Sequence, residues 1–181
     1  MHFMILVQYR DHTSSNELVV ASCQDETDLR FFYKHDGSAL SICDTRDIGS
    51  ATPFKVIIAG TRYFQDYPLL CRWMDYYLQN IDPKHVVIIS GMARGADSLG
   101  EQYARDHGFL LHQCPADWDR YGKSAGYRRN VVMAEVAGPG GACVCFWDGK
   151  SRGTQHMINI AKEHNLLLRV VNYEKGCELP V

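Results

Sequence analysis

From Phe54 onward, short apolar runs alternate with segments of helical periodicity. FKVIIAG begins at Phe54, and four further runs follow in the order HVVIIS, FLLHQCP, ACVCFWD and LLLRVV. Nearly continuous apolar runs of this length are typical of strands that are buried on both faces of a sheet. Strands that alternate with helices pair in parallel, with helices on both faces. The sequence therefore predicts a Rossmann-like α/β domain over residues 54–172, with about five parallel strands, followed by a tail over residues 173–181.

Residues 1–50 lack helical periodicity and indicate a small β-rich N-terminal unit. Four β-like runs, HFMILVQYR, ELVVASC, RFFYKHD and SALSICD, are separated by polar or glycine-containing turns. This pattern predicts an antiparallel β unit without chemistry of its own. A small isolated β unit is marginal in water. We therefore expect it to pack on the main domain or on a second subunit, which favours a homo-oligomer.

Composition narrows the class of protein. Hydrophobic residues make up 46% and charged residues 22%, as in ordinary globular proteins. No apolar run approaches the roughly 20 residues that span a bilayer, so no membrane partner is expected. The seven cysteines include no CxxC pair, which favours a reducing cytoplasm. No group of His, Cys, Asp and Glu has zinc spacing, so no metal is expected.

Two strand-to-helix junctions combine glycine with a cation. In parallel sheets, ligands bind outside the carboxyl ends of the strands. The first junction, residues 60–62, offers close backbone approach, a hydroxyl and a guanidinium suited to phosphate. In the second, residues 90–97, two glycines four apart open a helix and predict an anion-binding nest. The alternatives are an ordinary turn and an acid that satisfies the helix dipole. The candidate ligand-binding residues are Gly60, Thr61, Arg62, Ser90, Gly91, Arg94, Gly95 and Asp97.

Two further segments carry cations between strands and helices. ADWDRYGKSAGYRRN, residues 116–130, is predicted to be a long polar loop, whose aromatics and cations suit base stacking and phosphate binding. The alternative is that Trp118 only anchors this loop. The last junction, residues 148–154, again places glycine, hydroxyls and cations at a helix N-terminus. The candidates are Asp117, Trp118, Tyr121, Lys123, Arg128, Arg129, Asn130, Ser151, Arg152, Gly153 and Thr154.

Most of the cations that follow residue 50 belong to these segments. Eight of them lie in or beside loops that the predicted topology gathers at one edge of the sheet: Arg62, Arg94, Arg120, Lys123, Arg128, Arg129, Lys150 and Arg152. Independent solvated charges would instead be spread over helix surfaces. The predicted site therefore prefers an anionic ligand. The net charge of −2 is too weak for a duplex-DNA footprint.

Four motifs in this order resemble the YspA-like branch of the SLOG superfamily. They are AGTR, SGMARGAD, ADWDRYGKSAGYRRN and FWDGKSRGT, and the resemblance covers about residues 54–172. The superfamily also includes the DNA-processing protein A domain and the Lonely Guy phosphoribohydrolases. The resemblance implies a Rossmann-like domain that binds nucleotides or nucleotide-derived signals in bacteria and their phages.

The sequence departs from the Lonely Guy enzymes where they carry the PGGxGTxxE signature. Pro139-Gly140-Gly141 precedes a strand here and indicates a turn, while the segment after that strand, Ser151 to Met157, lacks the glutamate tied to catalysis. The resemblance therefore carries over no catalytic residue and no cleavage of an N-glycosidic bond.

Three functions remain open from the sequence. One is a module that senses or sequesters a nucleotide-derived molecule, and another is a hydrolase that acts on its glycosidic or phosphate bond. A weaker reading is single-stranded nucleic-acid binding. One of Asp97, Asp117 and Asp119 could act as a general base or bind a ribose hydroxyl, and ribose contact is favoured for Asp97 or Asp117. A surface position is expected for His156, and His112 lies on a predicted strand.

Overall fold

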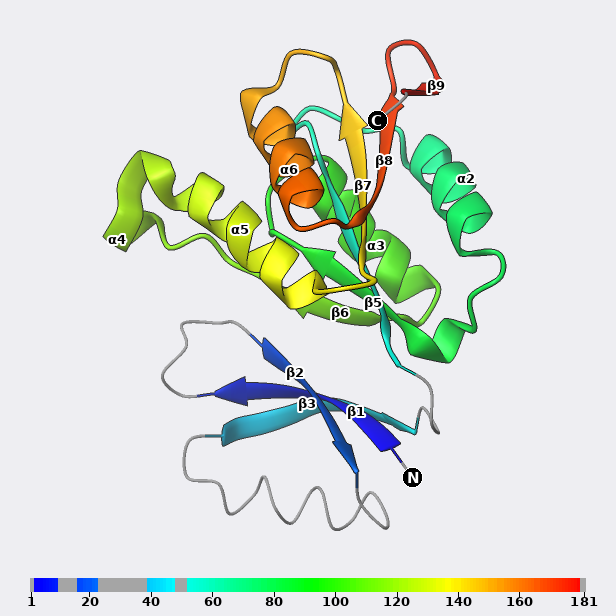
Figure 1. Ribbon diagram of the computed structural model, residues 1–181, viewed down its shortest axis with the longest axis vertical. Coiled ribbons are helices and arrows are strands. Elements are labelled where there is room, and N and C mark those ends of the chain that lie inside the picture. Colours follow the sequence, from blue (N-terminus) through cyan, green and yellow to red (C-terminus); the bar gives the residue numbers. More distant parts are fainter. Residues whose placement is uncertain (1, 10–15, 23–38, 48–51, 180–181) are drawn as a thin grey trace. The chain divides into compact units, whose positions relative to one another are not determined.

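The computed structural model describes residues 2–9, 16–22, 39–47 and 52–179 (Figure 1). The chain divides into two compact units, residues 1–53 and 54–181. In the N-terminal unit, β1 (His2–Tyr9) lies between β2 (Asn16–Ser22) and β3 (Ala39–Asp47), and both pairings are antiparallel. These strands confirm the predicted antiparallel β unit. The predicted run RFFYKHD lies outside the described residues, and the homo-oligomer stays a prediction.

The second unit is built on a six-stranded sheet. Its order is β6 (Leu110–Gln113), β5 (Val86–Ser90), β4 (Phe54–Gly60), β7 (Ala142–Trp147), β8 (Leu167–Asn172) and β9 (Cys177–Leu179). The first five strands pair in parallel, which confirms the predicted Rossmann-like sheet. β9 pairs antiparallel with β8, so the predicted tail contributes a short edge strand that its sequence did not indicate.

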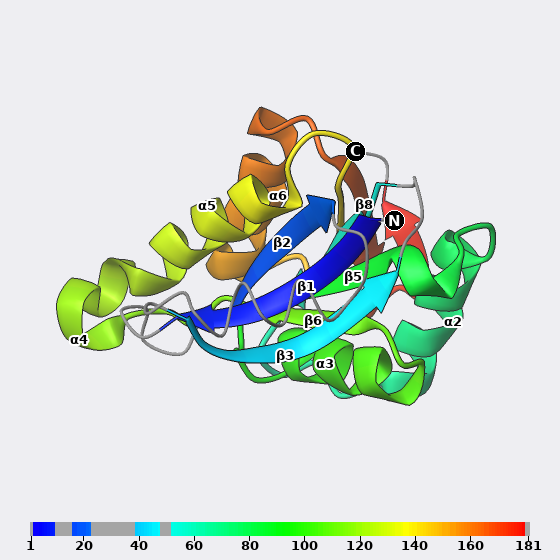
Figure 2. The same ribbon diagram turned by 90° about the horizontal axis from the view of Figure 1, so that it is seen from below.

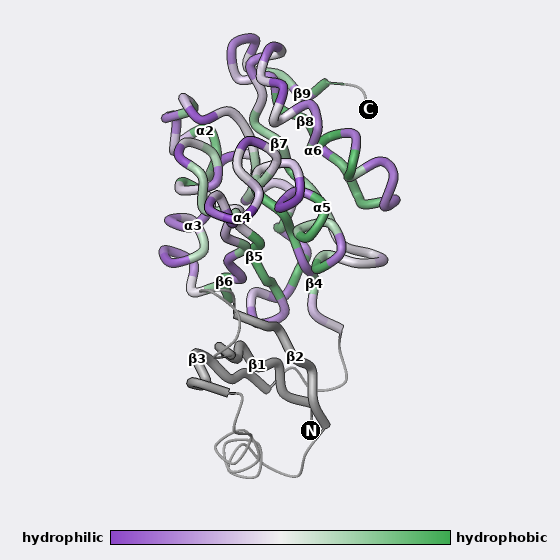
Figure 3. Tube along the Cα trace, turned by 90° about the vertical axis from the view of Figure 1, so that its left-hand side faces the viewer, coloured by the Kyte–Doolittle hydropathy of each residue, from purple (hydrophilic) through white to green (hydrophobic). Residues whose placement is uncertain are grey.

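Helices cover both faces of this sheet, as predicted. α2 (Tyr67–Leu78) and α3 (Ala96–Asp106) pack on one face, and α5 (Ala125–Ala137) and α6 (Arg152–Glu163) on the other (Figure 2). Alternation along the strands supplies a core on each side. In β4, Val56 and Ile58 belong to the α2–α3 side and Ile57 and Ala59 to the α5–α6 side. Figure 3 shows the hydrophobic strands between helices that carry hydrophilic residues.

Short helical turns occupy two connections. The 3₁₀ turn η1 (Pro83–His85) precedes β5, and α4 (Trp118–Tyr121) with η2 (Gly122–Ser124) leads directly into α5. The predicted polar loop over 116–130 is therefore wrong: most of it is helical. Asp117 caps α4, because its carboxylate accepts the Arg120 N–H at 2.9 Å. The segment is so rich in cations that its helical periodicity was not recognised. The buried positions of α5 are Ala125, Asn130, Met133, Ala134 and Ala137.

The strand order reverses between β4 and β7. The chain runs outward from β4 through β5 to β6, and then returns to place β7 on the other side of β4. Loops leave the carboxyl ends of β4 and β7 toward opposite faces, which opens a crevice there. At the base of this crevice the ends of β4 and β7 approach so closely that only glycine fits at Gly60, because a Cβ there would lie 2.2 Å from the Phe146 carbonyl oxygen. The next N–H, that of Thr61, donates to the same oxygen at 2.9 Å.

Candidate functional site

A cavity of about 470 Å³ opens at this switch point, and we call it the first cavity. All four predicted segments contribute to its walls. The predicted residues that line it are Gly60, Thr61, Arg62, Asp97, Trp118, Lys123, Arg129, Asn130, Ser151, Gly153 and Thr154. The topology therefore brings together residues that are up to about ninety positions apart in sequence, as expected for the carboxyl edge of a doubly wound sheet.

The remaining predicted residues lie elsewhere. Gly91 and Arg94 line an adjoining cavity, which we call the second cavity. Ser90 is buried beneath the loop that follows β5, and Asp117 caps α4. The side chains that line neither cavity are those of Ser90, Asp117, Tyr121, Arg128 and Arg152, together with Gly95. Tyr121 packs against two guanidinium groups, of Arg120 and Arg128, at 5.1 and 4.5 Å from its ring centroid.

Several lining residues escaped the sequence analysis of the site. They are Ala59, Tyr63, Ala93, Gly126, Tyr127, Asp148 and Met157, whereas Lys150, which also lines the cavity, was among the cations expected at this edge. Lys123, Gly126, Tyr127 and Asn130 are spaced by three, one and three residues, which places them on one side of a helix. Helical periodicity over 123–130 is the signal that would have found Gly126 and Tyr127.

The N-terminus of α6 opens into the first cavity. Ser151 caps the helix, with its Oγ accepting the Thr154 N–H at 3.4 Å. Gly153, the second residue of the helix, is exposed, and a Cβ there would meet no atom within 4 Å. α6 has no acidic residue in its first turn. The positive end of the helix dipole therefore faces a space that an anion can enter.

Asp148 shapes the loop that precedes α6. Its Oδ1 accepts the N–H groups of Lys150 and Ser151 at 2.8 and 2.7 Å, and its own N–H donates to Thr61 Oγ1 at 3.3 Å. Burial acts to raise the pKa of the Asp148 carboxyl, but these backbone donors outweigh it, so the pKa lies below its usual value. The loop is thereby tied to the end of β4, with Asp148 ionised.

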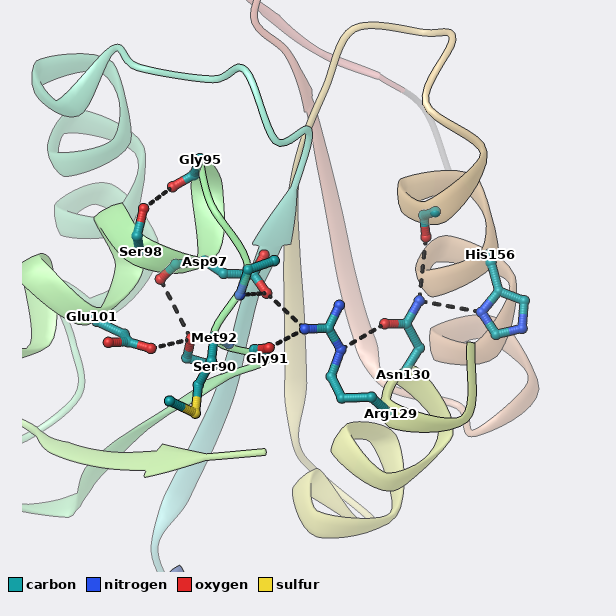
Figure 4. Close-up of polar contacts among 12 residues, drawn as sticks. Ser90, Gly91, Met92, Gly95, Asp97, Ser98, Glu101, Arg129, Asn130 and His156 are labelled. Atoms are coloured by element: carbon teal, nitrogen blue, oxygen red, sulfur yellow. Dashed lines mark hydrogen bonds and ion pairs between the residues drawn. The ribbon is translucent and has the colours of Figure 1, made fainter. Parts of the chain in front are cut away.

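On the opposite wall, Asp97 and Arg129 form a buried ion pair (Figure 4). The Asp97 carboxylate, 3% exposed, lies 3.4 Å from Arg129 Nη1 and accepts the Ala93 N–H at 3.4 Å. The same guanidinium donates to the Gly91 carbonyl oxygen. Burial raises the pKa of the Asp97 carboxyl, and the charge of Arg129 opposes that shift. Both groups are thus committed to each other and to the loop after β5.

Asn130 extends this network to α6. Its Oδ1 accepts from Arg129 Nε at 3.3 Å, and its Nδ2 donates to the Gly153 carbonyl and to His156 Nδ1, both at 3.2 Å (Figure 4). His156 packs edge-on against Tyr127, and burial lowers the pKa of its imidazole. His156 is therefore half-buried behind the site rather than on the surface. A continuous polar path joins the loop after β5 to the first turn of α6.

Trp118 stands at the rim of the first cavity. Its side chain is half exposed, and the Arg62 guanidinium lies 5.9 Å from its ring centroid. An exposed indole beside a cation can stack on a planar base while the guanidinium meets phosphate.

The other candidate side chains lie away from this edge. His112 is buried on β6, where burial and the nearby charge of Lys55 lower the pKa of its imidazole to about 4. Cys143 and Cys145 lie in the core on the same side of β7, with their Sγ atoms 3.6 Å apart, so both are packing residues. Within the described ranges, no three His, Cys, Asp or Glu residues gather as a metal site would require.

Comparison with known proteins agrees with the four motifs. The profile of the YspA, cpYpsA-related SLOG family matches residues 54–121. Gene 61 protein of Mycobacterium phage D29 is 32% identical over 126 residues, which cover 66% of this chain and 95% of that protein. The chain belongs to the YspA, cpYpsA-related SLOG family. The resemblance drawn from the motifs is confirmed, and the first two motifs of this SLOG domain lie inside the matched range.

Two negative findings complete the comparison. No solved structure is significantly similar to this SLOG chain. Among the helices in the described part of the chain, none has the length and apolar character needed to cross a membrane.

Proposed function

We propose that this chain binds a phosphate-bearing nucleotide or nucleotide-derived molecule in the first cavity, as a sensor or sequestering module. The observation that carries the proposal is the pairing of two features in one cavity. The open N-terminus of α6 lies on one side, and the exposed indole of Trp118 on another. Phosphate suits the first feature and a planar base the second.

The cations of the cavity support an anionic ligand. Arg62 and Lys123 form no ion pair with a described residue, and Lys150 reaches Glu174 only at 3.9 Å with 80% of its side chain exposed. Exposed pairs of this kind contribute little. These three cations are therefore available to a ligand, whereas Arg129 is already committed to Asp97.

The carboxylates of the cavity favour binding over hydrolysis. Asp97 is paired with Arg129, and Asp148 accepts two backbone N–H groups that hold its pKa low. A general base works best with a pKa near the operating pH. Asp148 does not meet that requirement because its pKa is lowered, and Asp97 is held in its buried ion pair with Arg129.

The test places a negative charge where the phosphate would lie. Gly153→Asp is compared with its neutral isostere Gly153→Asn, since the position has open space for either side chain. Binding of 5′-mononucleotides such as AMP is measured by isothermal titration calorimetry. We expect Gly153→Asp to weaken binding by about ten- to a hundredfold relative to Gly153→Asn. Without ligand, the Asp variant should melt no earlier, because an acid in the first turn complements the helix dipole.

Two outcomes would change the proposal. Equal affinities of the Asp and Asn variants would place the phosphate away from α6. Mass spectrometry of the recovered nucleotide separates the remaining functions, because an intact nucleotide indicates a binding module and an altered one a hydrolase.

A further inference from the structure

The second cavity, about 420 Å³, adjoins the first. It lies between the loop that follows β5 and the connection from β6 to α4, with Gly91, Arg94 and Ala116 among its lining residues. Arg62, Trp118 and Arg129 line both cavities. A ligand that extends past Trp118 from the first cavity would therefore enter the second without leaving the protein surface.

Among the described residues that line the second cavity there are cations and no acid. Its charged lining residues are Arg62, Arg94 and Arg129, and Arg129 is committed to Asp97. Arg94 is exposed and forms no ion pair with a described residue. Arg62 contacts the Trp118 ring and forms no ion pair within the described part of the chain. Two guanidinium groups thus face this space with no counter-charge from its walls, which is the arrangement that binds phosphate bidentately.

Backbone donors of this loop are already used within the protein. The Met92 N–H donates to Ser90 Oγ at 3.0 Å, and the Ala93 N–H donates to the Asp97 carboxylate at 3.4 Å. Asp97 thus takes up a backbone donor that this loop would otherwise offer to an anion. Among the lining side chains, Arg94 is the cation that lines only the second cavity.

We infer that the second cavity holds a second phosphate group of the ligand. The ligand class is then a nucleotide derivative with two separated phosphates, one at the N-terminus of α6 and one at Arg94, with its nucleoside against Trp118. This inference rests on the proposed function of the first cavity and adds the class of ligand to it.

The experiment compares ligands with one and two phosphates. AMP, adenosine 3′,5′-bisphosphate and the linear dinucleotide 5′-pApA are titrated into the full chain and into Arg94→Ala. The control is Arg72→Ala, which removes an exposed arginine of α2 that lines neither cavity. We expect at least one two-phosphate ligand to bind the unaltered chain about ten- to a hundredfold tighter than AMP. Arg94→Ala should lose most of that gain and keep its affinity for AMP, and Arg72→Ala should keep both.

Each other result overturns a different statement. If AMP binds but neither two-phosphate ligand binds tighter, or if their gain survives in Arg94→Ala, the second cavity holds no phosphate and the first cavity keeps its proposed function. If Arg94→Ala weakens AMP equally, Arg94 serves the first phosphate. If none of the three ligands binds, the proposed function itself fails.

Discussion

The loop between β5 and α3 and the loop between β7 and α6 both end at a helix N-terminus, but only the first helix carries an acid in its first turn. Each combines glycine, a hydroxyl and an arginine within a few residues. In the first loop, the Asp97 carboxylate turns inward to the Ala93 N–H and to Arg129. In the second, Asp148 binds the loop before the helix begins, and Gly153 stays exposed at the cavity.

The difference follows from one residue type at one position. α3 carries an acid, Asp97, in its first turn, and α6 carries none. A carboxylate there supplies the anion that the helix dipole favours, so no external anion is needed. The first loop thus becomes a wall that fixes Arg129, and the second becomes the proposed phosphate site.

The largest expected effect on stability comes from removing the ion pair between Asp97 and Arg129. Arg129→Met leaves the Asp97 carboxylate buried without its partner, which should lower the free energy of unfolding by about 3–5 kcal/mol. Arg128→Met is the matched control, because Arg128 is exposed and forms no ion pair with a described residue, while its contact with the Tyr121 ring is worth about 0.5–1 kcal/mol. Urea unfolding of both variants measures the difference. If Arg129→Met lowers the free energy of unfolding no more than Arg128→Met does, the contrast between the two loops fails.

The next test exchanges glycine for alanine in each loop. In the first, a Cβ on Gly91 would lie 2.0 Å from Arg129 Nη1 and would push the guanidinium away from Asp97. Gly91→Ala should therefore cost about 1–3 kcal/mol. In the second, Gly153→Ala meets open space in a helix and should stabilise the domain by about 0.5–1 kcal/mol. Thermal unfolding without ligand decides, and equal shifts in both variants would remove the contrast between the loops.

Strand alternation made the sheet predictable, because each apolar run is long enough to cross a core and each but the last is followed by a helix. It also placed Gly60, Trp118 and Ser151 correctly at one edge, since topology alone gathers the carboxyl ends of parallel strands. The three-residue β9 was not predicted, because none of its residues is buried and its sequence shows no apolar run.

The direction of side chains around a helix end was not predictable in the same way. Arg152 and Gly153 are adjacent in sequence, but a helical turn of about 100° per residue sends them to different sides, and only Gly153 lines the cavity. Nor did the sequence show whether Asp97 faces inward or toward a ligand. That choice depends on Arg129, which lies 32 residues away.

The smallest effect concerns the far end of the network that links the two loops. Asn130 Nδ2 donates to His156 Nδ1, a contact that requires this nitrogen to be unprotonated, and burial holds the pKa of His156 below its ordinary value. Above a pH of about 6.5 the imidazole is neutral in both folded and unfolded chains. Below that pH the unfolded chain takes up the proton first, so the stability of the fold decreases as the pH falls.

His156→Asn keeps an acceptor near Asn130 and cannot titrate. The difference in unfolding free energy between the two proteins should therefore shift against the unaltered chain as the pH falls from about 7.5 to 5, and His112, present in both, cancels from it. A difference that stays constant over this range would mean that the Asn130 contact does not bias the proton on His156, and that the polar path ends at Asn130.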